Sequence, residues 1–134
     1  MPVMTAHKKT LYLLGDSRRS AERNRAVENN LRKLESIAML GENWNGYGAT
    51  PFSRSLVGKV KEIVLGLCIQ PELFPTAAGS IQLEYEKDNG DYLEIQVTED
   101  EFCSVFRSGS LGEESFAVMS DTSELNKLVG EFYD

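Results

Sequence analysis

The sequence is poor in the residues that most often carry catalysis or bind metals. Its 134 residues include one His, two Cys and one Trp. His7 lies near the start of the chain, where no base for a nucleophile is expected to be held in place. Cys68 and Cys103 are far apart and form no C-x-x-C pair, so the spacing predicts no zinc site. We expect no metal and no cofactor.

Long apolar runs are also missing. No run approaches the roughly 20 residues that a membrane-spanning helix needs, and Leu11–Leu14 is too short for the core of a signal peptide. These absences predict a cytoplasmic protein that does not enter a membrane. In that setting Cys68, on an expected helix, and Cys103, on an expected strand, are interpreted as reduced apolar core residues, with a bridge between them as the alternative.

The composition present is that of a globular protein, with 41% hydrophobic and 26% charged residues. We expect residues 1–15 to form an N-terminal arm or a short strand and residues 16–134 to form a single α+β domain. The chain is acidic, with a net charge of −7, but its charge is divided. Residues 1–70 carry eleven Lys or Arg against six acids, and residues 71–134 carry three against fifteen. The first part is therefore basic and the second strongly acidic.

The first half of the chain has the apolar spacing of two amphipathic helices. The first helix is expected to begin at Asp16 or Ser17 and to end near Leu40, with Gly41 in a left-handed conformation. Residues 10–14 are either a short strand or the lead-in to this helix.

The second helix is expected to follow Ser53 as its N-cap and to end near Ile69, because Gln70 precedes a Pro. Residues 72–79 then form a crossing loop. Near the end of the chain, Asp121 followed by Glu124 is a capping-box pattern and predicts a third helix.

Between residue 80 and the third helix, apolar residues alternate with polar ones. Asn89-Gly90 separates two alternating segments, which is typical of a β-hairpin. The expected strands are residues 81–86, 92–97, 102–107 and 115–119. The sequence therefore predicts an α+β fold in which an antiparallel β-meander of three to four strands packs on helices, in the order α-α-β-β-β-β-α.

In this arrangement one face of the sheet is covered by helices and the other is acidic. The uncovered face would carry Tyr92 among carboxylates, which is either an ordinary solvated surface or a docking surface for a basic partner. The residues assigned to this surface are Tyr92, Glu84, Glu86 and Glu94.

One segment resembles a known family of small bacterial proteins of uncharacterised activity. These proteins share a W-(D/N)-G-(Y/E)-G-A segment, a P-x-S helix start and, after a Pro, a G-x-I-x-L-E-(W/Y) strand. The matching residues are Trp44, Asn45, Gly46, Tyr47, Gly48, Ala49, Pro51, Ser53, Pro75, Gly79, Ile81, Leu83, Glu84 and Tyr85. The resemblance covers roughly residues 31–106 and implies no activity. Asn45 stands where Asp is common, and Tyr85 stands where Trp is common.

The segment from Glu42 to Pro51 has two interpretations. In one, Trp44 and Tyr47 cover the end of the helical pair as part of the core. In the other, they form a recognition site for a ligand or partner.

Three classes of function follow from these observations. The first is a non-catalytic protein-interaction module of accessory, immunity or antitoxin type, acting on an unidentified partner. The second is a nucleic-acid-binding protein that uses the basic arm and first helix. Its candidate residues are Arg18, Arg19, Arg23, Arg25, Arg32 and Lys33. The third is a metal-dependent hydrolase built on the sheet carboxylates, which has the least support. An edge strand or the basic helix also offers a route to a homodimer.

Overall fold

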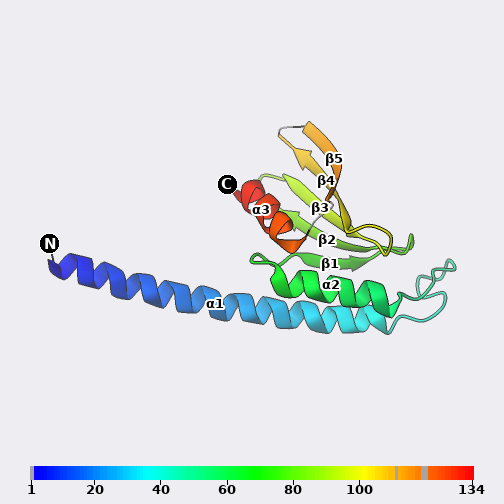
Figure 1. Ribbon diagram of the computed structural model, residues 1–134, viewed down its shortest axis with the longest axis horizontal. Helices are drawn as coiled ribbons and strands as arrows, with labels where there is room; N and C mark the ends of the chain where they lie inside the picture. Colours follow the sequence, from blue (N-terminus) through cyan, green and yellow to red (C-terminus); the bar gives the residue numbers. More distant parts are fainter. Residues whose placement is uncertain (1, 111, 119–120) are drawn as a thin grey trace.

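The computed structural model describes the backbone of residues 2–110, 112–118 and 121–134. Side chains are described for residues 18–110, 112–116 and 121–134. Over these residues the chain forms an α+β fold with three helices and a five-stranded sheet (Figure 1). The elements in chain order are α1 (Pro2–Ala38), α2 (Arg54–Gly66), β1 (Glu72–Pro75), β2 (Ile81–Glu86), β3 (Tyr92–Val97), β4 (Cys103–Gly109), β5 (Gly112–Val118) and α3 (Thr122–Tyr133).

The sheet is an antiparallel meander in which β1 to β5 lie side by side in chain order. The sheet therefore has five strands, and the prediction of three to four strands is wrong. The additional strand, β1, lies in the range 72–79 that was expected to be a crossing loop. Leu73 of β1 is fully buried, and Pro75 ends the strand at the edge of the sheet, where a missing amide is tolerated.

The central hairpin of the sheet confirms the alternating pattern. β2 and β3 pair from Ile81 opposite Val97 to Glu86 opposite Tyr92, and Gly90 in the turn has a positive φ of 92°. The two later strands are longer than expected, and the last residue of the expected fourth strand, Met119, lies outside the described residues.

The helices α2 and α3 cover one face of the sheet, and α1 packs on the outer side of α2 (Figure 1). Ser53 is the N-cap of α2 and accepts a hydrogen bond from the Leu56 N–H, and Asp121 does the same for α3 with the Glu124 N–H. The core between these layers draws on α1, α2, α3 and four strands. Cys103 belongs to it, as expected.

The first helix differs from its prediction at both ends. It begins at Pro2, so residues 10–14 are helical and neither Asp16 nor Ser17 is an N-cap. Proline is favoured in the first turn, and a Gly inside a helix costs only about 1 kcal/mol, so Gly15 does not stop the helix. The helix ends at Ala38, and Gly41 is not left-handed.

The second helix ends at Gly66, three residues before the predicted end. The Asn126 side chain of α3 donates to the Gly66 carbonyl and accepts from the Cys68 N–H, both at 2.8 Å. This tertiary contact satisfies backbone groups that another helical turn would have satisfied. Cys68 is consequently an exposed free thiol, and the prediction that it is a core residue on a helix is wrong.

Candidate functional site

The uncovered face of the sheet carries a row of carboxylates that crosses three strands. Glu72 of β1 lies opposite Glu84 of β2, which lies opposite Glu94 of β3. Side chains directly opposite each other in antiparallel strands share a face, so all three carboxylates lie on the same side. The row continues through Phe106 and Ser115. The sequence predicts Glu84 and Glu94 on this surface but not Glu72, because the segment that contains Glu72 was expected to be a loop.

Glu94 is held in place by two neighbouring side chains. The Gln82 amide donates to it at 2.6 Å and to Glu84 at 3.3 Å, and the Tyr92 hydroxyl donates to it at 2.8 Å. Partial burial and these carboxylate acceptors raise the pKa of the Tyr92 phenol. Tyr92 therefore keeps its proton and acts as a hydrogen-bond donor at neutral pH.

Beyond Glu94 the uncovered face is hollowed between β3 and β5. The hollow is lined by Glu94, Gln96, Ser104, Phe106 and Ser115, among others. The Tyr92 and Phe106 rings stand beside it, with their centroids 6.4 Å apart. Glu86, which pairs with Tyr92 across the hairpin, is exposed at one end of the face. The four predicted sheet residues, Tyr92, Glu84, Glu86 and Glu94, therefore lie together on one surface.

The facing carboxylates lead to a prediction about stability. Replacing Glu84 with Gln is expected to raise the free energy of unfolding by about 0.5 kcal/mol, because like charges directly opposite in a sheet are destabilising. The amide oxygen of Gln can still accept the Gln82 hydrogen bond. Urea unfolding at pH 7 measures the difference, which should shrink as salt screens the charges.

Glu62→Gln is the matched control, because Glu62 is an exposed acid on α2. It removes the same charge without removing a facing carboxylate, so its effect should stay close to zero. A loss of stability in Glu84→Gln relative to this control would show that Glu84 is not repelled by the carboxylates of Glu72 and Glu94.

In the loop between α1 and α2, Trp44 and Tyr47 differ in how far their side chains are buried. Trp44 is half-buried, packs on Phe52 with ring centroids 5.9 Å apart, and donates from Nε1 to the Thr50 carbonyl at 3.0 Å. Tyr47 is 93% exposed. Only Trp44 covers the core in the way that the sequence suggested for both residues.

Two Asn side chains hold this loop in its shape. Asn45 Oδ1 accepts from the Tyr47 N–H at 2.8 Å and from the Ala49 N–H at 3.1 Å, and Asn43 Oδ1 accepts from the Gly48 N–H at 2.6 Å. Asn43 itself has a positive φ of 60°, which Asn tolerates better than most residues. The conformation of the loop therefore depends on acceptor oxygens at positions 43 and 45.

This geometry predicts opposite outcomes for two substitutions of Asn45. Asn45→Ala is expected to lower the free energy of unfolding by about 1 to 2 kcal/mol, because two backbone N–H groups lose their acceptor. Asn45→Asp keeps the oxygen and adds a charge, so it should be at least as stable as the parent at pH 7. Thermal and urea unfolding of both variants measure the effect, and equal destabilisation by both would contradict it.

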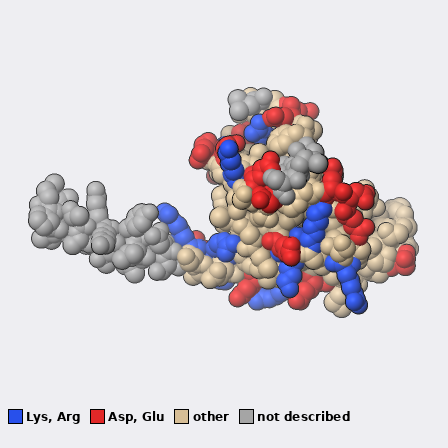
Figure 2. All heavy atoms as spheres, in the orientation of Figure 1, with Lys and Arg blue, Asp and Glu red and all other residues tan. Residues whose placement is uncertain are grey.

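The candidate nucleic-acid residues on α1 fall into two groups. Arg23 donates to the Leu65 and Leu67 carbonyls, both at 3.0 Å, and Lys33 Nζ lies 4.6 Å from the centre of the Phe74 ring. These two cations hold α1 against the rest of the fold. The exposed members are Arg18, Arg19, Arg25 and Arg32. Figure 2 shows that Lys and Arg side chains lie among Asp and Glu side chains on the visible side of the molecule.

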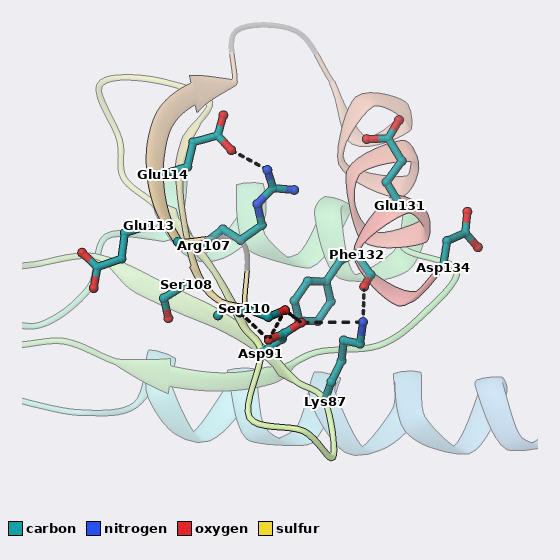
Figure 3. A pocket seen from close by; sticks show the side chains of 12 residues that line it. Lys87, Asp91, Arg107, Ser108, Ser110, Glu113, Glu114, Glu131, Phe132 and Asp134 are labelled. Carbon is teal, nitrogen blue, oxygen red and sulfur yellow. Dashed lines mark hydrogen bonds and ion pairs between the residues drawn. The ribbon is translucent and has the colours of Figure 1, made fainter.

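A third surface, which the sequence did not indicate, lies between α3 and the hairpin of β4 and β5 (Figure 3). Asp91, after the turn that precedes β3, accepts from the Ser110 N–H at 3.0 Å, and this hydrogen bond lowers the pKa of the Asp91 carboxyl. Lys87 donates to the Phe132 carbonyl at 3.1 Å, and Arg107 forms an ion pair with Glu114. These contacts join the β2–β3 turn, the β4–β5 turn and the end of α3 around a hollow of about 270 Å³.

The described residues offer no metal centre for the hydrolase hypothesis. Within residues 18–110, 112–116 and 121–134, no three His, Cys, Asp or Glu side chains are grouped so that they could hold a metal ion. In the same part of the chain, no helix combines the length and apolar character that crossing a bilayer requires. Comparisons of the chain with protein-family models, curated proteins and solved structures find no match.

Proposed function

We propose that this chain is a non-catalytic protein-interaction module that binds a cationic segment of a partner on the uncovered face of its sheet. The observation that carries the proposal is the row Glu72, Glu84 and Glu94 across three neighbouring strands. None of the residues paired on this face within the sheet is Lys or Arg. Lys33 of α1 lies over Phe74 at the β1 edge of this face, and a Lys or Arg from a partner would supply positive charge at Glu84 and Glu94.

The surroundings of the row support binding rather than simple solvation. Facing carboxylates cost stability, so keeping them is easier to understand if they are neutralised in a complex. Tyr92 and Phe106 offer aromatic surface beside the carboxylates, and Tyr and other aromatics are enriched at the centres of interfaces. The exposed free thiol of Cys68 fits a reducing compartment, which supports the cytoplasm as the location. An accessory, immunity or antitoxin role is compatible with such a module.

The test compares two variants that lose the same charge in different places. Glu84→Gln/Glu94→Gln removes two carboxylates from the sheet face, and Glu35→Gln/Glu62→Gln removes two exposed carboxylates from the helices. Both are immobilised and used to capture proteins from the native host at low ionic strength. A partner that the parent and the helix variant retain, and that the sheet variant loses, supports the proposal. Equal retention by all three, or no retained protein, would reject it.

One observation favours the second candidate, nucleic-acid binding. Arg18, Arg25 and Arg32 are exposed and follow one another at seven-residue intervals, so they lie along nearly the same side of α1. Binding of duplex and single-stranded oligonucleotides is measured at two salt concentrations. This function requires strongly salt-dependent binding that Arg18→Glu/Arg25→Glu abolishes and that Lys61→Glu/Lys127→Glu weakens less.

A further inference from the structure

The sheet ends in two edge strands, and the first of them, β1, packs against α1. β5 is the last strand of the meander and pairs with β4 alone. In Figure 1 it lies at the end of the sheet opposite to α1 and α2. A free edge presents unpaired N–H and C=O groups and is a template for an added strand.

A groove runs beside this edge on the side of the sheet that carries the helices. Two adjoining hollows between α3 and the β4–β5 hairpin share Arg107, Glu114 and Glu131. Figure 3 shows Arg107 and Glu114 on the strand side and Glu131 on α3 across from them. At the other end of the groove, Phe116 of β5 and Leu128 of α3 are only partly buried. The groove therefore has a charged part and an apolar part.

The lining of the groove is acidic. Six acidic residues stand against three basic ones, and two of the basic side chains form ion pairs with acids of the lining, Arg107 with Glu114 and Lys87 with Asp91. The acidic residues are Asp91, Glu113, Glu114, Glu124, Glu131 and Asp134. A segment that enters the groove needs positive charge to match this lining.

We propose that the free edge of β5 and this groove bind an extended, basic segment of another protein, which adds to the sheet as a sixth strand. Side chains on one face of the added strand would enter the groove at every second position. Glu114 is paired with Arg107 and lies across the groove from Glu131, and Phe116 is two residues further along β5. The segment should therefore present a basic residue to Glu131 and an apolar residue two positions away. This surface is separate from the carboxylate row on the opposite face of the sheet.

The composition of β5 argues against a second copy of this chain as the occupant. Residues 112–118 contain Glu113 and Glu114 and no Lys or Arg. Pairing of two β5 edges would bring two acidic grooves together without supplying a cation. All Lys and Arg residues except Lys87 and Arg107 lie on helices, so a second copy also lacks an extended basic segment. The occupant is therefore a different, basic chain.

The test uses the blocked peptide Lys-Thr-Val-Thr-Lys-Thr-Val as a probe. As a strand it carries Lys and Val on one face and Thr on the other. Two N-methylated forms are compared, one methylated at the Thr residues and one at the Lys and Val residues. Because alternate N–H groups of an added strand point toward β5, only one form should lose affinity. Amide shifts in NMR spectra should fall on β5 and α3.

Charge variants complete the test. Glu131→Lys is expected to weaken binding of the peptide by about tenfold or more, while Glu35→Lys and Glu62→Lys, at exposed acids of α1 and α2, leave it unchanged. Far-UV circular dichroism checks that Glu131→Lys is folded; this residue is exposed near the end of α3, where Lys is favourable. The proposal is overturned if the peptide does not bind, if both methylated forms bind alike, or if the shifts map to the opposite face of the sheet.

Discussion

Replacing Gly109 with alanine is expected to destabilise the fold by about 2 to 4 kcal/mol, through steric overlap and backbone strain together. Gly109 has a φ of 155° at the end of β4. A Cβ atom there would lie 2.7 Å from Asp91 Cγ and 3.1 Å from Asp91 Cα. The Asp91 carboxylate cannot simply rotate away, because it accepts the Ser110 N–H. The new methyl group would push the β4–β5 turn away from the β2–β3 turn.

Gly90→Ala is the matched control for this prediction. Gly90 also has a positive φ, of 92°, but a Cβ atom there would meet no atom within 4 Å. Its cost is therefore backbone strain alone, about 1 to 2 kcal/mol. Urea unfolding of both variants gives the comparison. Equal losses would mean that the contact between Gly109 and Asp91 contributes nothing.

The surroundings of Asp91 include one feature that the sequence predicts, the hairpin turn, and one that it does not, the contact with Ser110. The pair Asn89-Gly90 predicts the hairpin turn because these residues adopt positive φ at little cost, and the register of β2 and β3 follows from strict alternation. The bond from Asp91 to Ser110 joins turns 19 positions apart, and no local pattern encodes it. The groove beside α3 depends on that junction, so no local pattern in the sequence indicates it.

The errors in element boundaries have the same origin. Ser53 and Asp121 were identified as N-caps because capping is a local interaction between residues three positions apart. The end of α2 was misplaced because it is fixed by Asn126, which is 60 positions from Gly66. β1 was missed because four residues that end in Pro75 show little alternation. Only its pairing with β2 makes that segment a strand.

The candidate site was predictable to a similar degree. Glu84 and Glu94 could be paired from the hairpin alone, since residues that flank a tight turn at equal distances face each other. Glu72 can be assigned to the row only from the structure, which shows that its segment is a strand paired with β2. The Asn45 hydrogen bonds also predict that Asp is tolerated at this position, because either side chain provides an acceptor oxygen.

Replacing Trp44 with alanine is expected to lower the free energy of unfolding by about 2 to 3 kcal/mol. Truncating a fully buried aromatic typically costs about 3 to 5 kcal/mol, and Trp44 is only half-buried. The loss combines its packing on Phe52 with its hydrogen bond to the Thr50 carbonyl. Trp44→Phe keeps an aromatic ring in that position and removes the N–H donor, so it should cost about 1 kcal/mol.

Tyr47→Ala separates the two interpretations of this loop. Because Tyr47 is 93% exposed, its removal should change stability by less than about 0.5 kcal/mol. If the loop is purely structural, Trp44→Ala loses stability but binds the captured partner as the parent does at a temperature where both are folded. If the loop is a recognition site, Tyr47→Ala loses that partner without losing stability. Because Tyr47 is exposed and Trp44 is half-buried, substitutions at these two positions of one loop measure binding and stability separately.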